Sequence, residues 1–267
     1  MLKAILGRAI PPRVTLRWQA QRNLRSGEPE LSLVQDLCDG SHAAVDVGAN
    51  IGVYAYVARK YAAHVYAVEA NPRMAERLQR TLGKDEKVTV LPFALSDTDG
   101  EATLWLPYKG TVEVSTRSSL EADANPGFQT HAVGVQKKML DDLRLHDVGF
   151  IKIDVEGHEL AVLRGASKTL ASCHPNLLIE IEERHHAGGT SRAFSYLRDL
   201  SYRGYFIHDG KLNSIEEFDP ELHQRSENAK SVGGRRNSNY VNNFIFIHPT
   251  RSDASKRIAK RFPFGGS

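Results

Sequence analysis

The chain has 267 residues, of which 41% are hydrophobic and 25% charged, enough to bury the core of one substantial domain. Its apolar runs fall far short of the roughly 20 residues that a bilayer span needs, which excludes a transmembrane helix. No secretory signal is visible at the start, and the two cysteines, Cys38 and Cys173, favour neither a disulfide framework nor a metal cluster. We therefore expect a soluble, cytoplasmic protein.

The net charge of +3 is unevenly distributed, because cations precede the first acid, Glu28, and crowd the segment 251–267. Basic ends can bind nucleic acid or an anionic membrane surface, or they can simply be solvated and partly disordered. No aromatic interleaving or RNA-binding motif accompanies these charges. We expect solvated ends and no nucleic-acid partner, while peripheral membrane contact through the basic ends stays open.

Short β-branched apolar runs alternate with helical stretches, a pattern typical of a parallel sheet. The predicted strands, in chain order, are 43–47, 64–68, 87–91, 150–154, 176–181, 205–208 and 243–248. The predicted helices are 53–61, a helix that begins at 72, 159–170 and 191–200. The last two strands lack a clear helix between them, so we expect them to pair antiparallel across a long polar loop.

This succession predicts a doubly wound, Rossmann-like α/β domain with a seven-stranded, mostly parallel sheet whose last strand is antiparallel. We assign 1–40 to a basic N-terminal extension with a leading helix, 41–250 to the main domain and 251–267 to a basic C-terminal tail. An insert at about 97–149 is too long for a plain connection, and alternation at 102–106 indicates a hairpin within it. We expect part of the insert to form a lid over the substrate.

The first motif, AAVDVGANIG, is a strand that ends in Asp46 and turns through Gly48, Asn50 and Gly52 into a helix. A turn poor in side chains lets a ligand approach the backbone. The dinucleotide fingerprint G-x-G-x-x-G requires glycine where Asn50 and Val53 stand, which weakens a nicotinamide interpretation.

The second motif, VYAVEANP, ends the second strand in Glu69, 23 positions after Asp46. This offset is close to the roughly 20 residues at which an acid meets ribose hydroxyls in such folds. A carboxylate can accept from two vicinal hydroxyls at once, and it repels a 2′-phosphate. Ala70 follows Glu69, and Ala94 and Ser96 follow the third strand where an adenine would lie, although Asp-Thr-Asp-Gly there is also an ordinary turn.

The third motif, FIKIDVEGHELAVLRGA, places Asp154 and Glu156 at the end of the fourth strand, with His158 two positions on. Carboxylates and an imidazole at the rim of a cleft are candidate general bases, although acids here also favour the positive end of the following helix. Lys152 lies within a central strand and requires a partner. We expect that partner to be Asp154, Glu180 or Glu182.

Together these segments, from Asp46 to Glu182, resemble the FkbM family of methyltransferases. The landmarks are DVGANIG, VEANP, ALSDTDGEATL, LDDL, IKIDVEGHELAVLRGA and LLIEIE. The resemblance implies a class I methyltransferase fold, S-adenosylmethionine as cofactor, and a hydroxyl of a sugar, glycan or natural product as acceptor. The residues expected to hold the cofactor are Asp46, Gly48, Asn50, Gly52, Glu69, Ala70, Ala94, Ser96 and Asp154.

Transfer from a sulfonium is an in-line displacement that the protein accelerates mainly by orientation. An alcohol must also lose its proton, so the predicted catalytic residues, with Glu182 as a further helper, are Asp154, Glu156, His158 and Glu180. The Asn/Asp-Pro-Pro-aromatic signature of many amino-group methyltransferases is absent after the fourth strand, which favours oxygen as the acceptor atom. No metal site is predicted, because no metal-motif spacing connects Asp154, Glu180, Glu182, His185 and His186.

Two alternatives stay open. The first is an NAD-dependent oxidoreductase or epimerase, and the second is a non-catalytic module that binds RNA or a membrane through its basic ends. The combination of Asp46, Gly48 and Glu69 speaks against the second. The segments 107–134 and 213–242 should shape the acceptor pocket, but neither they nor any other part of the chain indicates which acceptor is used or how the chain oligomerises.

Overall fold

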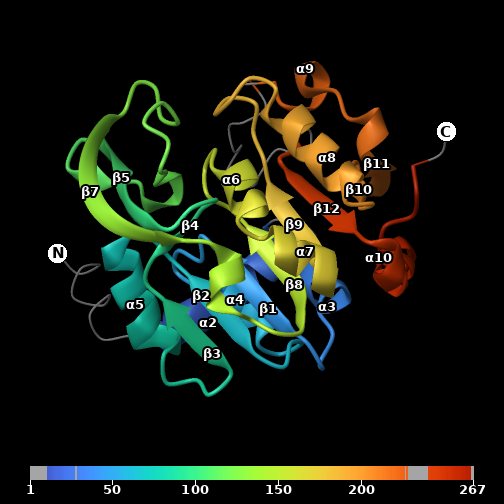
Figure 1. The fold of residues 1–267 in the computed structure, drawn as a ribbon, viewed down its shortest axis with the longest axis horizontal. Helices are drawn as coiled ribbons and strands as arrows, with labels where there is room; N and C mark the ends of the chain where they lie inside the picture. The colour runs from blue at the N-terminus through green and yellow to red at the C-terminus, as the bar shows by residue number, and fades with distance from the viewer. Residues whose placement is uncertain (1–10, 28, 226, 228–239, 266–267) are drawn as a thin grey trace.

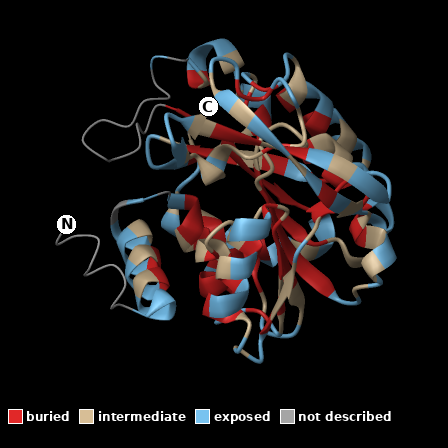
Figure 2. Cartoon of the chain, turned by 90° about the vertical axis from the view of Figure 1, so that its left-hand side faces the viewer, coloured by how far each residue is buried: buried red, intermediate tan, exposed pale blue. Residues whose placement is uncertain are grey.

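The computed structural model describes residues 11–27, 29–225, 227 and 240–265. A central eight-stranded sheet is covered by helices on both faces, and a smaller four-stranded sheet projects from it (Figure 1). The helices α2 to α5 and α10 enclose one hydrophobic core, and α6 to α8 enclose a second core on the other face. Buried positions lie mainly on the strands and on the inner faces of the helices (Figure 2).

The large sheet has the order β11-β10-β12-β9-β8-β1-β2-β3, in which the run from β9 to β3 is parallel. β12 is antiparallel to both of its neighbours, β9 and β10. The predicted fold class, with an antiparallel last strand, is therefore confirmed. The strands are β1 Ala43–Val47, β2 Val65–Val68, β3 Val88–Leu91, β8 Val148–Ile153, β9 Asn176–Glu180, β10 Arg203–His208, β11 Lys211–Ser214 and β12 Asn243–Ile247.

The predicted count of seven strands is wrong by one, because β11 pairs with β10 as a tight hairpin. Asp209 and Gly210 connect the two strands, with φ values of 49° and 70°. Two successive residues with positive φ suit the twist of a two-residue hairpin, and Asp-Gly is a strong sequence indicator of such a turn.

The helices after the strands begin close to the predicted positions. They are α4 Val53–Ala58, α5 Pro72–Leu82, α6 Glu159–Arg164, α7 Ser167–Cys173 and α8 Gly189–Asp199. The single helix predicted at 159–170 is wrong, since it is divided into α6 and α7 at Gly165. A Cβ on Gly165 would lie 1.9 Å from the Ser96 carbonyl oxygen. Asp141 then accepts hydrogen bonds from the Lys168 and Thr169 amides at 2.9 Å, which caps α7.

The insert forms the smaller sheet, whose order is β4-β7-β5-β6. Its strands and 3-10 helices are β4 Ala94–Leu95, β5 Gly100–Lys109, β6 Val112–Glu113, η2 Ser115–Arg117, β7 Gln129–Lys138 and η3 Leu140–Leu143. β5 and β7 pair antiparallel over their whole length, which confirms the predicted hairpin. Leu104, Leu106 and Val135 form a small separate core with Ala94. The insert is therefore tied to the main sheet through the chain that follows β3.

The N-terminal helices and the last helix, α10, pack on the same face of the large sheet, whereas η4 contributes Ile215 to the core on the other face. The N-terminal elements are α2 Pro12–Ser26, η1 Pro29–Leu33 and α3 Val34–Leu37, and the C-terminal elements are η4 Ile215–Glu217, α9 Pro220–His223, η5 Pro249–Arg251 and α10 Asp253–Arg261. Ile258 of α10 is fully buried, and Arg261 forms an ion pair with Asp36 at 2.7 Å. The C-terminal segment, which was expected to be solvated, is therefore a packed helix over α10. Its Arg261 stabilises the contact with the N-terminal part of the chain.

Among the described residues, no helix combines the length and the apolarity needed to cross a bilayer. The basic residues Lys3 and Arg8, and residues 226 and 228–239 of the expected polar loop at 213–242, lie outside the described residues.

Candidate functional site

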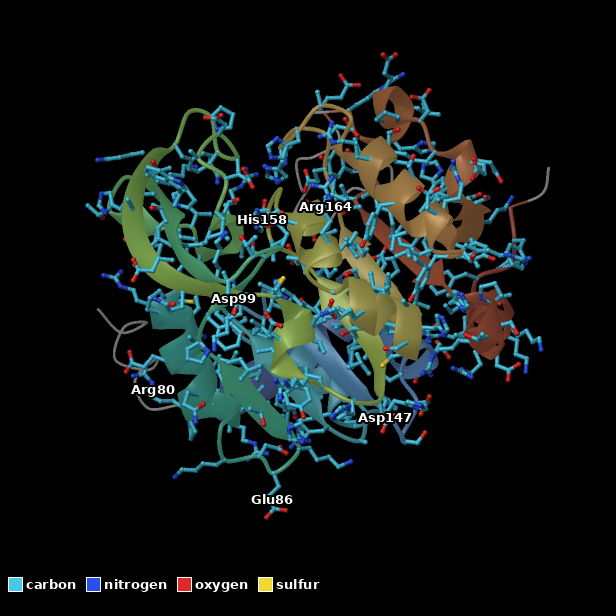
Figure 3. All side chains as sticks on the ribbon, viewed as in Figure 1. Arg80, Glu86, Asp99, Asp147, His158 and Arg164 are labelled. Carbon is cyan, nitrogen blue, oxygen red and sulfur yellow. The ribbon has the colours of Figure 1, made fainter. Side chains whose placement is uncertain are left out.

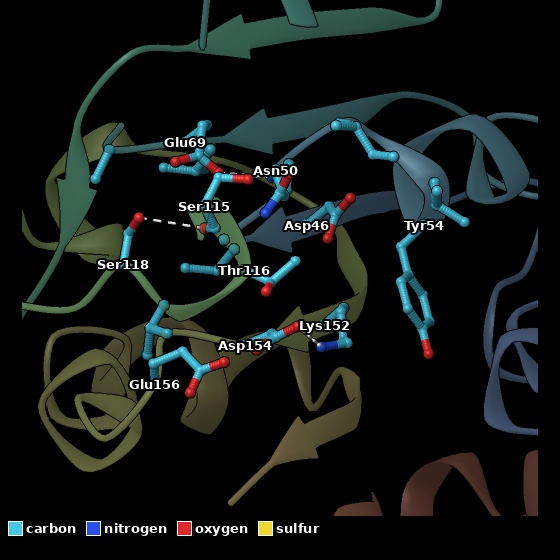
Figure 4. Close-up of a pocket in the computed structure, with 18 of the residues that line it drawn as sticks. Asp46, Asn50, Tyr54, Glu69, Ser115, Thr116, Ser118, Lys152, Asp154 and Glu156 are labelled. Carbon is cyan, nitrogen blue, oxygen red and sulfur yellow. Dashed lines mark hydrogen bonds and ion pairs between the residues drawn. The ribbon is translucent and has the colours of Figure 1, made fainter. Parts of the chain in front are cut away.

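A cleft of about 820 Å³ opens at the carboxyl ends of β1, β2 and β8. The chain proceeds from β1 to β2 in one direction along the sheet and from β8 to β9 in the other, so the cleft lies at the topological switch point. Ligands of doubly wound sheets bind at this point. Polar residues that line the cleft are Asp46, Asn50, Glu69, Lys152, Asp154 and Glu156 (Figure 4).

The glycine turn after β1 is shaped by backbone packing as well as by the cleft. Gly48 has a φ of 78°, and a Cβ there would lie 1.8 Å from the Asp154 carbonyl oxygen. Gly52 has a φ of 87°, and its missing Cβ faces Leu78 at 2.5 Å. Gly48 and Asn50 line the cleft, whereas Gly52 lies outside its wall, so the structure does not bring Gly52 to the predicted cofactor site.

Glu69, at the end of β2, is held by two backbone amides. The Asn50 amide donates to Oε2 at 2.6 Å, and the Asn71 amide donates to Oε1 at 2.7 Å. The side chain is buried, and burial raises the pKa of Glu69 to about 7, although the two amides favour the ionised form. The carboxylate is thereby fixed in one orientation at the edge of the cleft, with lone pairs left for further donors.

Asp46, at the end of β1, accepts a hydrogen bond from the Ala55 amide at 2.8 Å. It therefore satisfies one of the unpaired donors in the first turn of α4. Burial raises the pKa of Asp46 to about 6, and the charge of Lys152 opposes that shift. The role that the geometry assigns to Asp46 is to fix the glycine turn and the helix that follows it.

Lys152, near the carboxyl end of β8, is 1% exposed although it carries an ammonium group. Its Nζ lies 3.2 Å from Oδ2 of Asp154 and 5.0 Å from the centre of the Tyr54 ring. The predicted pairing with Asp154 is confirmed, and Glu180 and Glu182 have other partners. Asp154 keeps 35% of its side chain exposed, so a carboxylate anchored on a buried cation faces the cleft.

Near the predicted adenine end, Ala70 and Ala94 line the cleft together with Phe93, which lies beside them. Ser96 does not. It is 1% exposed, and its Oγ lies 2.9 Å from Nε2 of His158. Ser96 is therefore a buried partner of the imidazole.

His158 is held on both ring nitrogens, because Nδ1 lies 2.6 Å from Oε1 of Glu121, a residue of the insert. Glu156 is held as well, since its Oε2 lies 2.9 Å from Nε2 of His185 and 3.1 Å from Arg184. Both side chains line the cleft, but each already has partners at its polar atoms.

Glu180 and Glu182 do not line the cleft. Asn242 donates to Glu180 at 2.6 Å and to Glu182 at 3.0 Å, and Glu182 also accepts from Arg184 and Tyr240. These donors lower the pKa of Glu182 to about 2 against the effect of burial. The predicted helper residues thus join a network behind the site. Within the described residues, no three His, Cys, Asp or Glu side chains gather to hold a metal ion.

The insert supplies a wall of the cleft that the sequence did not identify residue by residue. Ser115 and Thr116 line the cleft opposite the strand ends (Figure 4). The insert is fastened at three points, where Asn71 donates to Glu113 at 2.6 Å, Ser119 donates to the Glu156 carbonyl at 2.6 Å, and Glu121 meets His158. The helix α2 closes a further side with Gln19, Arg22 and Asn23.

Residues 46–207 match the sequence model of the methyltransferase FkbM domain. Over 202 residues the chain is 30% identical to the hexuronic acid methyltransferase AglP of Haloferax volcanii, and the match covers 74% of this chain and 77% of that protein. Methyltransferase 1 of Beauveria bassiana is 29% identical over 159 residues, which are 51% of this chain and 63% of that protein. The crystal structure of methyltransferase FkbM from Methylobacillus flagellatus aligns with a TM-score of 0.49 at 18% identity and covers 91% of this chain and 60% of that one.

The matched range covers more than half of the chain, and it contains β2, β8 and the carboxyl end of β1, which form the cleft. It also contains the motifs that carry the resemblance to the FkbM family, and the sheet has the class I arrangement that the resemblance implies. The protein is therefore a methyltransferase of the FkbM family.

Proposed function

We propose that the protein transfers a methyl group from S-adenosylmethionine to a hydroxyl oxygen of a sugar-containing acceptor. The observation that carries this proposal is the fixed carboxylate of Glu69 at one side of the cleft and the anchored carboxylate of Asp154 at another. Membership of a methyltransferase family supports the reaction type, and the relative described as a hexuronic acid methyltransferase supports a sugar acceptor.

The cleft fits the cofactor in size and in chemistry. Its volume lies within the range of about 300–1,000 Å³ that is usual for small-molecule sites. Glu69 would accept hydrogen bonds from the two ribose hydroxyls, and Ala70, Phe93 and Ala94 would enclose the adenine. When bound, the cofactor would supply a methyl group that is already activated on a sulfonium sulfur. Asn50 and Val53, where a dinucleotide fold needs glycine, support this cofactor over NAD.

Asp154 is the residue best supported as the general base. It is exposed to the cleft and held by Lys152, so it can accept the proton that the acceptor hydroxyl loses. His158 has neighbours at both nitrogens, and Glu156 is bound by Arg184 and His185. These two residues would shape the acceptor side of the cleft.

The walls of the cleft support an acceptor rich in hydroxyl groups. Carboxylates accept hydrogen bonds, and the hydroxyls of Ser115, Thr116 and Ser118 on the insert can both donate and accept. A sugar presents several such groups in a fixed arrangement. The insert is therefore proposed to act as the lid that orients one of them toward Asp154.

The test is methyl transfer from isotopically labelled S-adenosylmethionine to a panel of neutral and acidic sugars, with the product located by NMR. We expect a base-stable methyl ether on a hydroxyl, and we expect Asp154→Asn to lower kcat by about 100-fold with a smaller change in the KM for the cofactor. Glu86→Gln, far from the cleft, is the control (Figure 3). Transfer to nitrogen, a base-labile methyl ester, or full kcat in Asp154→Asn would contradict the proposal.

A further inference from the structure

A second cavity of about 200 Å³ adjoins the main cleft. His158 lines both, so the side cavity begins where the proposed acceptor region of the cleft ends. The start of α6, the loop after β9 and the start of α8 form its walls, and Glu121 of the insert forms its rim.

The acids that line the side cavity already have partners. Glu182 is bound by the three donors described above. Glu159 accepts from the Gly157 amide at 2.7 Å, and burial raises the pKa of Glu159 to about 7, which leaves it only partly ionised at neutral pH. Glu121 lies 2.6 Å from the imidazole of His158. Each of these acids thus has a hydrogen-bond partner within the protein.

Two arginines of the same wall have no acidic partner among the described residues. Arg164, in the last turn of α6, and Arg192, in α8, are exposed and line the cavity (Figure 3 labels Arg164). In the part of the chain that the structure describes, no carboxylate lies within ion-pair distance of either guanidinium. Among the described residues, Arg192 donates only to the Ala187 carbonyl, at 3.0 Å. Within this part of the chain, the cavity thus presents two cations without a counter-ion.

We propose that the side cavity binds an anionic group of the acceptor, a carboxylate, a phosphate or a sulfate, through Arg164 and Arg192. The planar guanidinium fork matches the oxygens of such groups and can bind them bidentately. The acceptor would then be an acidic saccharide whose anionic group occupies the side cavity while a hydroxyl faces Asp154 in the main cleft. This inference rests on the proposed function and specifies its substrate class.

Binding is measured by calorimetry on the complete chain, with and without S-adenosylhomocysteine. The probes are the methyl glycoside of glucuronic acid, glucose 6-phosphate and glucose 6-sulfate, and the neutral methyl glucoside is the reference. We expect at least one anionic probe to bind more tightly than the neutral sugar, and we expect Arg164→Gln combined with Arg192→Gln to weaken it by about tenfold or more. Arg198→Gln is the matched control, because Arg198 lies on α8 and pairs with Glu216 outside the cavity.

The subsite is rejected if no anionic probe binds more tightly than the neutral sugar, or if the double variant binds it as tightly as the unaltered chain. Methyl transfer and S-adenosylhomocysteine binding are measured on the same samples. A failure of the proposed function can therefore be distinguished from a failure of the anion subsite. Transfer to a hydroxyl without any preference for anions would reject only the subsite. Anion binding without methyl transfer would reject only the proposed reaction.

Discussion

Lys152 shows how a single buried charge organises the site. An ammonium group taken out of water costs several kcal/mol unless it is paired and hydrogen-bonded. Here the compensation comes from Asp154 at 3.2 Å, from the field of Asp46 and from the face of Tyr54. Asp46 and Asp154 would otherwise be two neighbouring carboxylates with no cation between them. The lysine therefore holds Asp154 in place, and it acts as a positioning residue.

The first prediction concerns Lys152→Met. Without the ammonium group, Asp154 loses the partner at 3.2 Å that orients it toward the cleft. We expect kcat to fall by about tenfold or more, with a smaller change in the KM for the cofactor. Lys152→Arg keeps the cation and should retain more of the activity.

The measurement is kcat and KM for both variants, with Lys256→Met, an exposed lysine of α10, as control. An unchanged kcat in Lys152→Met would show that Asp154 does not depend on this lysine.

The sequence identified residues of the site that follow one strand, but it could not identify pairs that meet from distant elements. Lys152 and Asp154 are two positions apart at the end of β8, where residues i and i+2 lie on the same face, so their pairing could be predicted from spacing. Glu121 and His158 are 37 positions apart, and neither motif indicates the other. Arg184 meets Glu156 across 28 positions for the same reason. Glu121 comes from the insert and Arg184 from the loop after β9, and the path of neither segment could be derived from local pattern.

At the scale of elements, the buried strands were the most predictable part, because β1 and β9 consist of nearly continuous apolar runs that local pattern reveals. β7 alternates exposed and partly buried residues around only one buried position, Val135, so its periodicity is weak. The division between α6 and α7 depends on the contact of Gly165 with Ser96, which exists only after folding.

The second prediction concerns Glu159, the buried acid at the start of α6. Its pKa is raised from an ordinary value of 4.5 to about 7, so the folded chain holds this proton more tightly than the unfolded chain does. The resulting stabilisation is fully present below pH 4.5 and is lost as the pH rises through 7. Glu159→Gln cannot ionise and keeps an acceptor for the Gly157 amide.

The difference in unfolding free energy between the variant and the unaltered chain should therefore shift in favour of the variant by about 2 kcal/mol from pH 5 to pH 8. Urea denaturation at both pH values tests this gain. Glu76→Gln, an exposed acid of α5, should change stability equally at the two pH values. An equal effect of pH on Glu159→Gln and on the unaltered chain would refute the burial effect.

At the scale of the whole molecule, the cleft is assembled from parts that are far apart in the chain. The sheet provides the carboxylates, the insert provides hydroxyl groups, and α2 provides a polar side wall. The C-terminal α10 packs on α3, and Arg13 near the start of α2 pairs with Asp85 at 2.7 Å. Part of the positive charge at both ends is thus used to hold the domain together.

The measurement that tests the central claim most directly is calorimetric titration of the folded chain with S-adenosylhomocysteine. The same titration is made with NAD as the ligand, and with S-adenosylhomocysteine on the Glu69→Ala variant. We predict saturable binding at a single site per chain, no heat with NAD, and a loss of affinity well over tenfold in Glu69→Ala while cooperative unfolding is retained. A folded chain that binds neither S-adenosylmethionine nor S-adenosylhomocysteine would contradict the account.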